Sequence, residues 1–378
     1  MKQGWYSESI EDLCEVEYGT RVVRKRDAGT IYLVYGGGGA TFSMDTYNRE
    51  DRMVIARFAM SKRCVRFVDG KFFLNDSGLT ISPLDDNTFD QDFLNYQILS
   101  LNDEIYSLAR GTAQKNLNVN AFKKVQLSYP ASLEEQKQIV AKLDQCFEAI
   151  DKARANAAKN LENAKELFQS KLNEIFSQKG EGWVEVVLNE IGETQTGTTP
   201  PTKDISNYGD YIPFVKPPHF SPDGSINTGS SMLSKSGLEK GRLFQSNSVL
   251  MVCIGATIGK TGFSTVPVSS NQQINCLTPK KEYNPKLFYY GLISPFVQRQ
   301  VIEIGSGSQA TLPIINKSKW SKLRINIPTE RSVQDVIVQL LDGLKQKTQP
   351  LESKYQQELN SLEELKKSIL QKAFKGEL

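Results

Sequence analysis

Residues 4–20 read GWYSESIEDLCEVEYGT, and residues 182–198 read GWVEVVLNEIGETQTGT. Each stretch opens with Gly-Trp, places two apolar residues at the same offsets and ends in Gly-Thr. Internal similarity of this kind indicates one structural unit that is used more than once. We therefore expect the 378-residue chain to contain two copies of one plan.

A second similarity lies near the end of each copy. VNAFKKVQLSYP ends at Pro130 and NKSKWSKLRINIP ends at Pro328, which sets an offset of 198 residues. The same offset holds through the long segments that follow, where it aligns Gln136 with Gln334. Between the two similarities the copies share only a few strand-like runs. We therefore expect a common plan with divergent middle parts.

Each copy ends in a long helical pattern. Residues 131–178 contain no Gly or Pro and carry apolar residues at the spacing of a coiled coil. Residues 332–374 repeat the pattern, although Gly343 and Pro350 are predicted to bend or interrupt the helix. One such segment is ordinarily a bundle helix, but two related ones favour mutual packing as an antiparallel coiled coil. At 1.5 Å per residue, a helix over 131–178 would span about 70 Å.

Eight residues of these segments are candidates for helix packing or partner binding, because most of them occupy matching positions in the two copies. They are Gln136, Ile139, Leu143 and Phe147 in the first segment and Gln334, Ile337, Leu341 and Leu344 in the second.

The charge of the chain is nearly balanced overall but uneven along its length. The whole chain carries 46 Lys and Arg against 43 Asp and Glu, a net charge of +3. Residues 21–71 alone hold 11 basic and 5 acidic residues, whereas the two helical segments are close to neutral. A local excess of basic residues is typical of contacts with backbone phosphates, and a solvated charged surface is the alternative.

The histidine and cysteine counts exclude several classes of chemistry. His219 is the one histidine, which argues against multi-histidine metal sites and a histidine-centred triad. The five cysteines are scattered without a CxxC pair, as expected in a reducing compartment. No stretch of about 18 apolar residues occurs, so we expect neither a secreted nor a membrane-spanning protein. We expect a non-catalytic chain with no cofactor and no metal of its own.

Three short motifs suggest binding sites but lack the context that those sites need. Residues 254–261, IGATIGKT, lack the first glycine of a phosphate loop and precede a strand-like stretch where a helix is required. Residues 216–219, KPPH, carry Lys216 and His219 where the motif of amino-group methyltransferases has an amide or carboxylate and an aromatic ring. The four glycines at 36–39 favour a tight turn over an anion site.

The repeat and its motifs resemble the specificity subunits of type I restriction-modification enzymes over the whole chain. The matching features include the Gly-Trp openings, TGTTP from residue 196, YIPF from residue 211 and LEEQKQI from residue 133. The terminal LKKSILQKAFKG from residue 365 is also similar. The chain departs from the family at ERSVQ from residue 330, where Glu-Glu-Gln is usual.

This resemblance implies a fold and domain limits. The fold class would be α/β in the broad sense (α+β). Two small mixed α/β target-recognition domains would stand in a pseudo-two-fold arrangement, separated by a long antiparallel two-helix coiled coil. The first recognition domain would occupy 1–130 and the second 179–330, with spacer helices at 131–178 and 331–378.

The resemblance also implies a function. Each recognition domain would bind one half of a bipartite, asymmetric sequence in double-stranded DNA, and helix length would set the spacer between the halves. Two modification subunits carrying S-adenosylmethionine would dock on the helices, and restriction subunits would join for cleavage. The chain would be non-catalytic and would act in the cytoplasm of a bacterial or archaeal cell, with no membrane partner.

Candidate DNA-binding residues follow from the side chains that suit base edges: Arg and Lys for guanine, Asn and Gln for adenine, and Thr for the thymine methyl group. In the first domain they are Arg21, Arg24, Lys25, Arg26, Tyr47, Asn48, Arg49 and Arg52. In the second domain they are Thr198, Thr199, Lys203, Lys216, His219, Gln272, Gln273 and Gln309. Most basic residues in such a set contact phosphate or solvent rather than bases.

Three other functions remain open on the sequence alone. A coiled-coil scaffold that binds only protein would share the helices. A recognition subunit of a restriction class that cuts on both sides of its site would share the whole architecture. A nucleotide hydrolase would need the incomplete motif around Lys260 to bind ATP.

Overall fold

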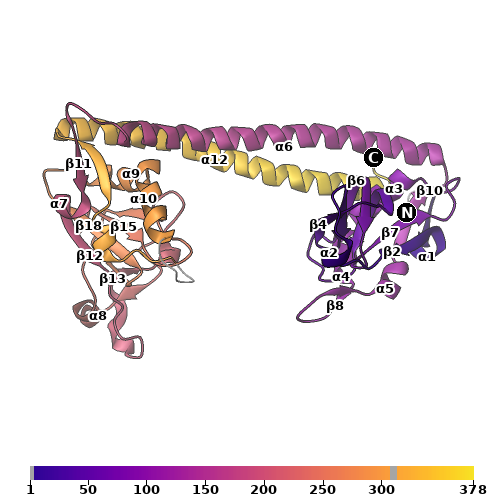
Figure 1. Ribbon diagram of the computed structural model, residues 1–378, viewed down its shortest axis with the longest axis horizontal. Helices are drawn as coiled ribbons and strands as arrows, with labels where there is room; N and C mark the ends of the chain where they lie inside the picture. The colour runs from indigo at the N-terminus through magenta and orange to yellow at the C-terminus, as the bar shows by residue number, and fades with distance from the viewer. Residues whose placement is uncertain (1–3, 307–312) are drawn as a thin grey trace. The chain divides into compact units, whose positions relative to one another are not determined.

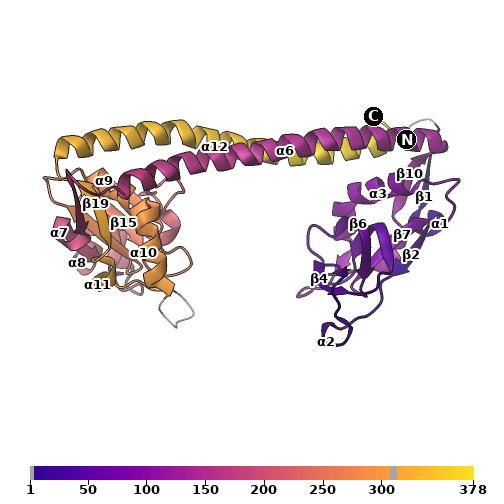
Figure 2. The same cartoon turned by 45° about the horizontal axis from the view of Figure 1, so that its top comes forward.

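The computed structural model describes residues 4–306 and 313–378, and the chain forms two compact units (Figures 1 and 2). Unit 1 contains Met1–Ala157 and Gln357–Leu378, and unit 2 contains Ala158–Gln356. Each unit combines a sheet-bearing domain with part of each of two long helices. The expected mixed α/β class, with two sheet-containing domains and two long helices, is confirmed.

The domain of unit 1 is built on a six-stranded sheet with the order β2-β7-β5-β6-β3-β4. Neighbouring strands pair antiparallel except β3 and β6, which run parallel. Strands β1 and β10 form a separate antiparallel pair, and so do β8 and β9. The elements are β1 Trp5–Ser9, α1 Ile10–Leu13, β2 Cys14–Tyr18, α2 Arg24–Asp27, β3 Tyr32–Gly36, β4 Gly39–Met44, β5 Arg49–Ala56, β6 Val65–Leu74, β7 Gly78–Pro83, α3 Gln91–Ser100, α4 Asn102–Ser107, β8 Ala109–Arg110, β9 Asn116–Leu117, α5 Val119–Lys123 and β10 Gln126–Pro130.

The domain of unit 2 contains a four-stranded sheet, β12-β18-β15-β16, and a three-stranded sheet, β14-β13-β17. Strands β11 and β19 form an antiparallel pair that corresponds to β1 and β10. The elements are β11 Trp183–Val187, α7 Leu188–Ile191, β12 Gly192–Thr196, η1 Ile205–Asn207, β13 Tyr208–Val215, η2 Pro217–His219, β14 Met232–Leu233, α8 Lys235–Lys240, β15 Ser248–Val252, β16 Thr261–Ser264, β17 Ser269–Ser270, β18 Ile274–Pro279, α9 Pro285–Ile293, α10 Pro295–Ser306, α11 Lys317–Trp320 and β19 Arg324–Pro328.

The central strand of each domain contains an apolar run, residues 53–56 of β5 and 249–252 of β15, because both faces of the sheet are covered there. In β5, Met53 and Ile55 belong to a core that includes residues of α3, whereas Val54 belongs to a second core with residues of β6. In β15, residues 249 and 251 likewise enter one core, and residues 250 and 252 enter another. Successive side chains of a strand point to opposite faces, so a continuous apolar run is the expected pattern for such a strand.

The two domains share their strand pairing although the middle parts of the two copies differ in sequence. Tyr18 of β2 pairs with Leu79, and Thr196 of β12 pairs with Asn275, at the same place in each copy. The one parallel contact recurs as well, between β3 and β6 in unit 1 and between β13 and β17 in unit 2. The expected divergence is therefore confined to side chains, loops and outer strands, while the central backbone pairing is common to both copies.

Two helices of 44 residues, α6 (Leu133–Phe176) and α12 (Arg331–Phe374), follow the two domains. At 1.5 Å per residue each is about 66 Å long. Helix α12 is continuous through Gly343 and Pro350, so the predicted interruption does not occur. Pro350 removes one backbone donor, but the helix continues because its apolar residues pack on both sides of that turn.

The packing within each unit makes the two helices antiparallel. In unit 1, Leu143 and Phe147 near the start of α6 share a core with Leu370 near the end of α12. In unit 2, Leu172 near the end of α6 shares a core with Leu341 near the start of α12. The start of each helix therefore packs with the end of the other.

The described residues contain neither a helix that could cross a membrane nor a cluster of metal-ligating side chains. No helix in residues 4–306 or 313–378 combines the length and apolarity needed to cross a lipid bilayer. The same residues hold no group of three or more His, Cys, Asp or Glu side chains arranged to bind a metal ion.

Candidate nucleic-acid interface

The segments that follow β12 and β13 meet at one edge of unit 2, on either side of the turn 271–273. The Thr198 amide donates to the Ser270 carbonyl at 2.9 Å. The Asn271 amide donates to the Val215 carbonyl at 3.2 Å. These bonds bring together three segments that are far apart in the sequence and that carry most of the candidates of the second domain.

The Gly-Thr pair that ends each repeated stretch marks a close backbone contact. A Cβ on Gly197 would lie 2.2 Å from the Asn271 carbonyl oxygen, and a Cβ on Gly19 would lie 1.9 Å from the Asn75 carbonyl oxygen. No side chain fits at such distances, so glycine is required at both places. The glycine is therefore repeated in both copies because each copy has the same close backbone contact at that position.

Polar side chains at the edge of unit 2 are held by one another. Thr199 Oγ1 donates to Gln272 Oε1 at 2.6 Å, and Asn271 Nδ2 donates to Gln273 Oε1 at 2.8 Å. Gln272 is exposed, and Thr198 and Thr199 are half-buried. Amide and hydroxyl groups oriented in this way can donate to and accept from base edges. The structure thus assembles four of the predicted residues into one polar surface.

Lys216 and His219 lie at the same edge, directly after β13. The Lys216 amide donates to His219 Nδ1 at 3.3 Å, which places the ring proton of a neutral imidazole on Nε2. Burial, together with the charge of Lys216, lowers the pKa of His219 below its ordinary value. Lys216 Nζ lies 5.4 Å from the centre of the Phe214 ring. The remaining candidate of this domain, Gln309, lies outside the described residues.

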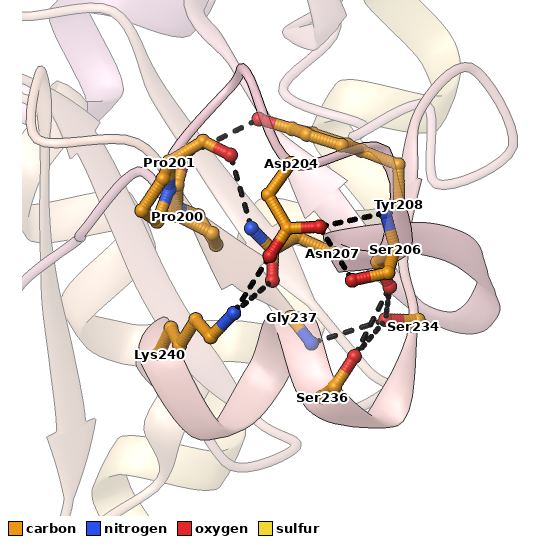
Figure 3. Close-up of polar contacts among 10 residues, drawn as sticks. All are labelled: Pro200, Pro201, Asp204, Ser206, Asn207, Tyr208, Ser234, Ser236, Gly237 and Lys240. Atoms are coloured by element: carbon orange, nitrogen blue, oxygen red, sulfur yellow. Dashed lines mark hydrogen bonds and ion pairs between the residues drawn. The ribbon is translucent and has the colours of Figure 1, made fainter.

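Lys203 is exposed on the loop between β12 and β13, and Figure 3 shows the polar network that holds this loop. The Asp204 carboxylate accepts from Ser206 Oγ at 2.6 Å and from Lys240 Nζ at 2.9 Å. Lys240 Nζ also donates to Asn207 Oδ1 at 2.9 Å. The hydrogen bonds from Ser206 and Lys240 lower the pKa of Asp204, so its charge is retained. The loop is therefore tied to helix α8 by a charged group.

The basic cluster of unit 1 lies on the segment between β2 and β3, which includes α2 (Figure 2). Arg21, Arg24, Lys25 and Arg26 are all exposed. Arg26 Nε donates to Asp27 Oδ1 at 2.8 Å, and this bond lowers the pKa of Asp27. Within the part of the chain that the structure describes, the other three cations have no ion-pair partner. They can therefore contact phosphate oxygens without breaking an internal bond.

Two predicted DNA-binding residues of unit 1 hold the fold instead. Asn48 Nδ2 donates to the Leu74 carbonyl at 3.2 Å, and Asn48 Oδ1 accepts from the Leu74 amide at 2.7 Å. Arg49 donates through Nε to Thr80 Oγ1 at 2.9 Å and through Nη2 to the Tyr18 carbonyl at 3.3 Å. These bonds occupy the groups that a base edge would need, so we reassign both residues from DNA binding to folding.

Tyr47 and Arg52 differ in how far their side chains are engaged. The Tyr47 side chain is 42% exposed, and its ring centre lies 5.1 Å from that of Tyr32. Lys71 Nζ lies 4.6 Å from the Tyr47 ring centre. Arg52 Nη1 donates to the backbone carbonyls of residues 50 and 51 at 3.3 and 3.2 Å. Tyr47 remains accessible to a ligand, whereas Arg52 is partly used by the irregular stretch of β5 at residues 50–52.

One cation that the sequence did not single out is Arg57, at the end of β5. Its guanidinium carbon lies 5.0 Å from the centre of the Tyr18 ring and 4.6 Å from the centre of the Phe58 ring. Arg57 was one of 11 basic residues in a basic stretch, and no local pattern distinguished it. Phe58 is its neighbour in the sequence, but Tyr18 lies at the end of β2, so only the folded chain brings both rings to Arg57.

The predicted packing residues of the two helices lie in the interior. Gln136 is 0% exposed and Gln334 is 1% exposed. Each side-chain oxygen accepts from the amide of a helix N-cap residue, Asp90 at 2.8 Å and Asn284 at 2.9 Å. Each side-chain nitrogen donates to the carbonyl of the proline six residues earlier, at 3.0 and 2.9 Å. These two glutamines therefore anchor a helix to its own domain rather than face a partner.

The other six packing candidates are buried or half-buried in the same two cores. They are Ile139, Leu143 and Phe147 in unit 1, and Ile337, Leu341 and Leu344 in unit 2.

The incomplete phosphate-loop motif forms a turn between two strands. The chain passes from β15 through residues 253–260 directly into β16, which begins at Thr261. A phosphate loop has to open a helix so that the helix N-terminal amides face the ligand. The segment therefore lacks the structural context of a nucleotide site, as its sequence indicated.

Sequence comparisons agree with this architecture. The family model of the type I restriction modification DNA specificity domain matches residues 2–160 and 180–361. The specificity subunit of the HindI type I restriction enzyme of Haemophilus influenzae is 30% identical over 154 residues, which are 40% of this chain and 33% of that subunit. The match therefore spans about a third of the HindI subunit. A putative type I specificity subunit of Mycoplasma genitalium is 21% identical over 384 aligned residues, covering 98% of this chain and 94% of the relative.

Solved structures with a similar fold come from the same kind of protein. A chain from a study of complex assembly and conformational transition in the type I restriction-modification system aligns over 100% of this chain and 99% of its own, at a TM-score of 0.72 and 19% identity. The HsdS subunit from Thermoanaerobacter tengcongensis aligns over 100% and 98% of the two chains, at a TM-score of 0.52 and 20% identity. These structures establish likeness of fold. Because the family model covers most of the chain in two stretches, one for each copy, this chain belongs to the family of type I restriction-modification DNA specificity subunits.

Proposed function

We propose that this chain selects the DNA sequence on which a type I restriction-modification complex acts. Unit 1 binds one half of a bipartite target in duplex DNA, and unit 2 binds the other half. The chain itself is non-catalytic. Methyl transfer from S-adenosylmethionine takes place on two modification subunits, and restriction subunits join the complex for cleavage in the cytoplasm of a bacterial or archaeal cell.

The observation that carries this proposal is one backbone plan with two different sets of polar groups. After β12, the edge of unit 2 presents hydroxyl and amide groups from Thr199 and Gln272. After β2, the segment of unit 1 presents the cations of Arg21 and Arg24. Hydrogen-bonding groups on base edges differ between base pairs, so two unlike surfaces suit two unlike half-sites.

The charge distribution supports binding to the DNA backbone. Residues 21–71 hold 11 basic and 5 acidic residues, and three of the cations between β2 and β3 are exposed without an ion pair among the described residues. Lysine and arginine on a surface displace counterions from DNA, which makes affinity depend on salt concentration. The near-neutral net charge of the whole chain conceals this local excess.

The outer surface of α12 supports the docking of partner subunits on the helices. Val333, Val336 and Leu340 are 40%, 64% and 49% exposed and are spaced by three and four residues. An apolar stripe at that spacing lies along one side of a helix, next to the face that carries the buried Ile337 and Leu341. Exposed apolar stripes of this kind mark surfaces for protein partners. We assign this stripe to a modification subunit.

Methylome sequencing of cells with and without this protein tests the proposal. We expect one methylated bipartite motif that is present only when the protein is made together with its modification subunits. Insertion of residues into both helices should lengthen the unread spacer without changing the two half-sites. Absence of any methylation that depends on this protein would contradict the proposal.

A direct binding experiment tests the basic cluster of unit 1. The double substitution Arg24→Ala and Arg26→Ala should weaken duplex binding by the complex with modification subunits. It should also lower the slope of log affinity against log salt concentration by about 1 to 2, because each lost phosphate contact removes about one unit. A slope equal to that of the unsubstituted complex would remove this cluster from the interface.

A further inference from the structure

The backbone bonds at the edge of unit 2 recur at the edge of unit 1. The Gly19 amide donates to the Gly78 carbonyl at 3.1 Å, as the Gly197 amide does to the Ile274 carbonyl at 3.0 Å. Four more amide-to-carbonyl bonds of unit 1 have an equivalent in unit 2. The bond from Thr20 to Leu74 corresponds to that from Thr198 to Ser270, and the bond from Asn75 to Tyr35 corresponds to that from Asn271 to Val215. The bond from Arg57 to Ser77 corresponds to that from Cys253 to Gln273, and the bond from Leu117 to Arg57 corresponds to that from Ile315 to Cys253. The two edges therefore correspond residue by residue, although their sequences do not.

This correspondence locates the segments of unit 1 that take the place of the candidate DNA-binding residues of unit 2. Thr20 takes the place of Thr198, the turn 75–77 that of 271–273, and the four glycines at 36–39 that of residues 216–219. Arg57 takes the place of Cys253, which is 2% exposed and packs inside unit 2. At this one position, unit 1 has a cation where unit 2 has part of its core.

The side chain of Arg57 is held between two exposed aromatic rings. Its guanidinium carbon lies 5.0 Å from the centre of the Tyr18 ring and 4.6 Å from that of Phe58. Tyr18 is 46% exposed and Phe58 is 37% exposed. Arg57 Nη1 donates to the Asp76 carbonyl at 3.4 Å, and no other hydrogen bond or ion pair of its guanidinium occurs among residues 4–306 and 313–378. Most of its planar set of donors is therefore available to a ligand.

The glycine turn beside these rings leaves open space at Gly38. A Cβ on Gly37 would lie 3.0 Å from the Phe58 carbonyl oxygen, so the turn packs directly against the loop that carries Phe58. A Cβ on Gly38 would meet nothing within 4 Å. Arg66 Nη2 donates to the Gly37 carbonyl at 2.9 Å and holds the turn in place. Unlike residues 216–219 of unit 2, this turn presents only backbone beside the cation.

We propose that this edge of unit 1 binds the first half of the DNA target and that Arg57 contacts the edge of a guanine in the major groove. The proposal rests on the proposed function and names a specificity-determining residue for it. The flat guanidinium can donate two parallel hydrogen bonds to guanine O6 and N7. Stacking between two rings restricts its rotamers before binding, so less conformational entropy is lost when the contact forms. The exposed Lys62, on the loop after β5, adds positive charge toward the DNA backbone.

The test compares Arg57→Met and Arg57→Lys with the unsubstituted chain, each in complex with modification subunits. Binding is measured against duplex libraries in which either half of the target is randomised. We expect both variants to lose about tenfold in discrimination at one G·C pair of one half-site, while the preference at the other half-site is unchanged. Arg57→Lys keeps the charge but loses the paired donors, so it should fail to restore discrimination.

Lys124→Met is the matched control, because it also removes one positive charge from unit 1. Lys124 lies near the start of β2, because the carbonyl of its neighbour Val125 accepts from the Ile10 amide. Arg57 instead contacts Tyr18, the last residue of β2. The control should leave both half-site preferences as they were. Equal thermal unfolding of all variants shows that each one folds.

Three outcomes separate this inference from the function on which it rests. Unchanged half-site preferences in Arg57→Met would overturn the inference alone. Uniform weakening across all sequences, with a salt slope lower by about 1 and recovery in Arg57→Lys, would show a phosphate contact and would also overturn it. Failure of the unsubstituted complex to prefer any duplex sequence would overturn the proposed function and the inference together.

Discussion

The edges of units 1 and 2 that we propose to bind DNA have the same backbone bonds but share few residues beyond the Gly-Thr pair and the asparagines Asn75 and Asn271. Unit 2 carries Lys216 and His219 on one loop, where unit 1 carries four glycines at 36–39. Unit 1 places Arg57 where unit 2 buries Cys253. Backbone hydrogen bonds need no particular side chain, and loops at a sheet edge contribute little to the core. Such an edge can therefore exchange its polar groups while the strands beneath it stay paired.

The comparison is different at the junction between each domain and its helix, where the side chains themselves are repeated. Gln136 and Gln334 make equivalent bonds to an N-cap amide and a proline carbonyl. Tyr96 and Tyr290 each donate to an aspartate of the long helix, Asp144 and Asp342. These contacts depend on side-chain shape and polarity, so they tolerate little change. The side chains at the junction are therefore the same in both copies because they hold the fold, whereas those at the edge differ because each edge is proposed to bind a different half-site.

The largest effect is expected from removing a buried amide at the junction. Gln136→Leu leaves the Asp90 amide and two backbone carbonyls without their partner, and we expect a loss of about 3 kcal/mol in unfolding free energy. Gln334→Leu breaks two hydrogen bonds instead of three, so we expect about 2 kcal/mol. Denaturant unfolding, with hydrogen exchange in β10 and β19 to separate the two units, measures both losses.

Gln138→Leu and Gln339→Leu are the matched controls for these two variants. Both glutamines are exposed on the same helices, so each change should stay within about 0.5 kcal/mol. Equal losses in buried and exposed variants would contradict the role of the two amides as anchors.

The next largest effect is expected where the glycine of each repeated Gly-Thr meets a backbone carbonyl. Gly19→Ala and Gly197→Ala would place a methyl group 1.9 and 2.2 Å from a carbonyl oxygen, so the turns have to shift. We expect about 2 kcal/mol of destabilisation for each, together with weaker binding of the half-site that belongs to the altered unit. Gly38→Ala is the control, since its Cβ would meet nothing within 4 Å. Retention of wild-type stability in both variants would contradict the close backbone contact at these two glycines.

A smaller difference is expected between the two tyrosine–aspartate pairs. Tyr290 is 0% exposed, and its partner Asp342 also pairs with Lys286 at 2.7 Å, whereas Tyr96 is only half-buried. Burial and the hydrogen bond to aspartate raise the pKa of both phenols. We expect Tyr290→Phe to cost about 1.5 kcal/mol and Tyr96→Phe about 1 kcal/mol in unfolding free energy.

The same two variants give a pH signature with a defined sign. A phenol whose pKa is higher in the folded state stabilises the fold fully below its ordinary value of 10.0 and loses that contribution as pH rises above it. The unsubstituted protein should therefore lose stability above pH 10 more steeply than either Tyr→Phe variant.

The smallest effect concerns His219, whose loop has no titrating counterpart among the glycines of unit 1. Burial and the charge of Lys216 lower its pKa below 6.5, so folding favours the neutral ring. The resulting contribution to stability is present above pH 6.5 and is lost as pH falls below that value. Because His219 is the one histidine of the chain, a single imidazole resonance in an NMR titration reports this pKa. Lys216→Met should raise the measured pKa, and a value above 6.5 in the unsubstituted protein would contradict the assignment.

The repeat, the two long helices and the anchoring glutamines could be predicted because each leaves a signal along the chain. Helical periodicity is local, and the constant offset of 198 paired Gln136 with Gln334 before their bonds were known. The shared strand pairing of the middle parts could not be predicted in this way. Its bonds join backbone groups, such as those of Thr20 and Leu74, that leave no trace in side-chain identity.

The candidate DNA-binding residues show even more clearly what the sequence could not predict. Residue type alone gave Arg49 the same weight as Arg24, yet Arg49 is bonded inside the sheet and Arg24 is exposed. Arg57 had no distinguishing local pattern and became notable only because the fold brings Tyr18 of β2 to it, beside its sequence neighbour Phe58. Availability to a ligand depends on which partners the fold supplies, and those partners are distant in the sequence.

The sequence by itself determined that one plan is used twice, that each copy ends in a long helix and that basic residues gather in the first domain. These properties follow from repetition, periodicity and composition, which can be counted along the chain. The tertiary structure alone decided that the divergent middle parts share one hydrogen-bonded backbone, that Asn48 and Arg49 hold the fold, and that Arg57 stands available at the edge. Those outcomes depend on long-range pairing, in which the free energy of a side chain is set by neighbours that only folding brings near.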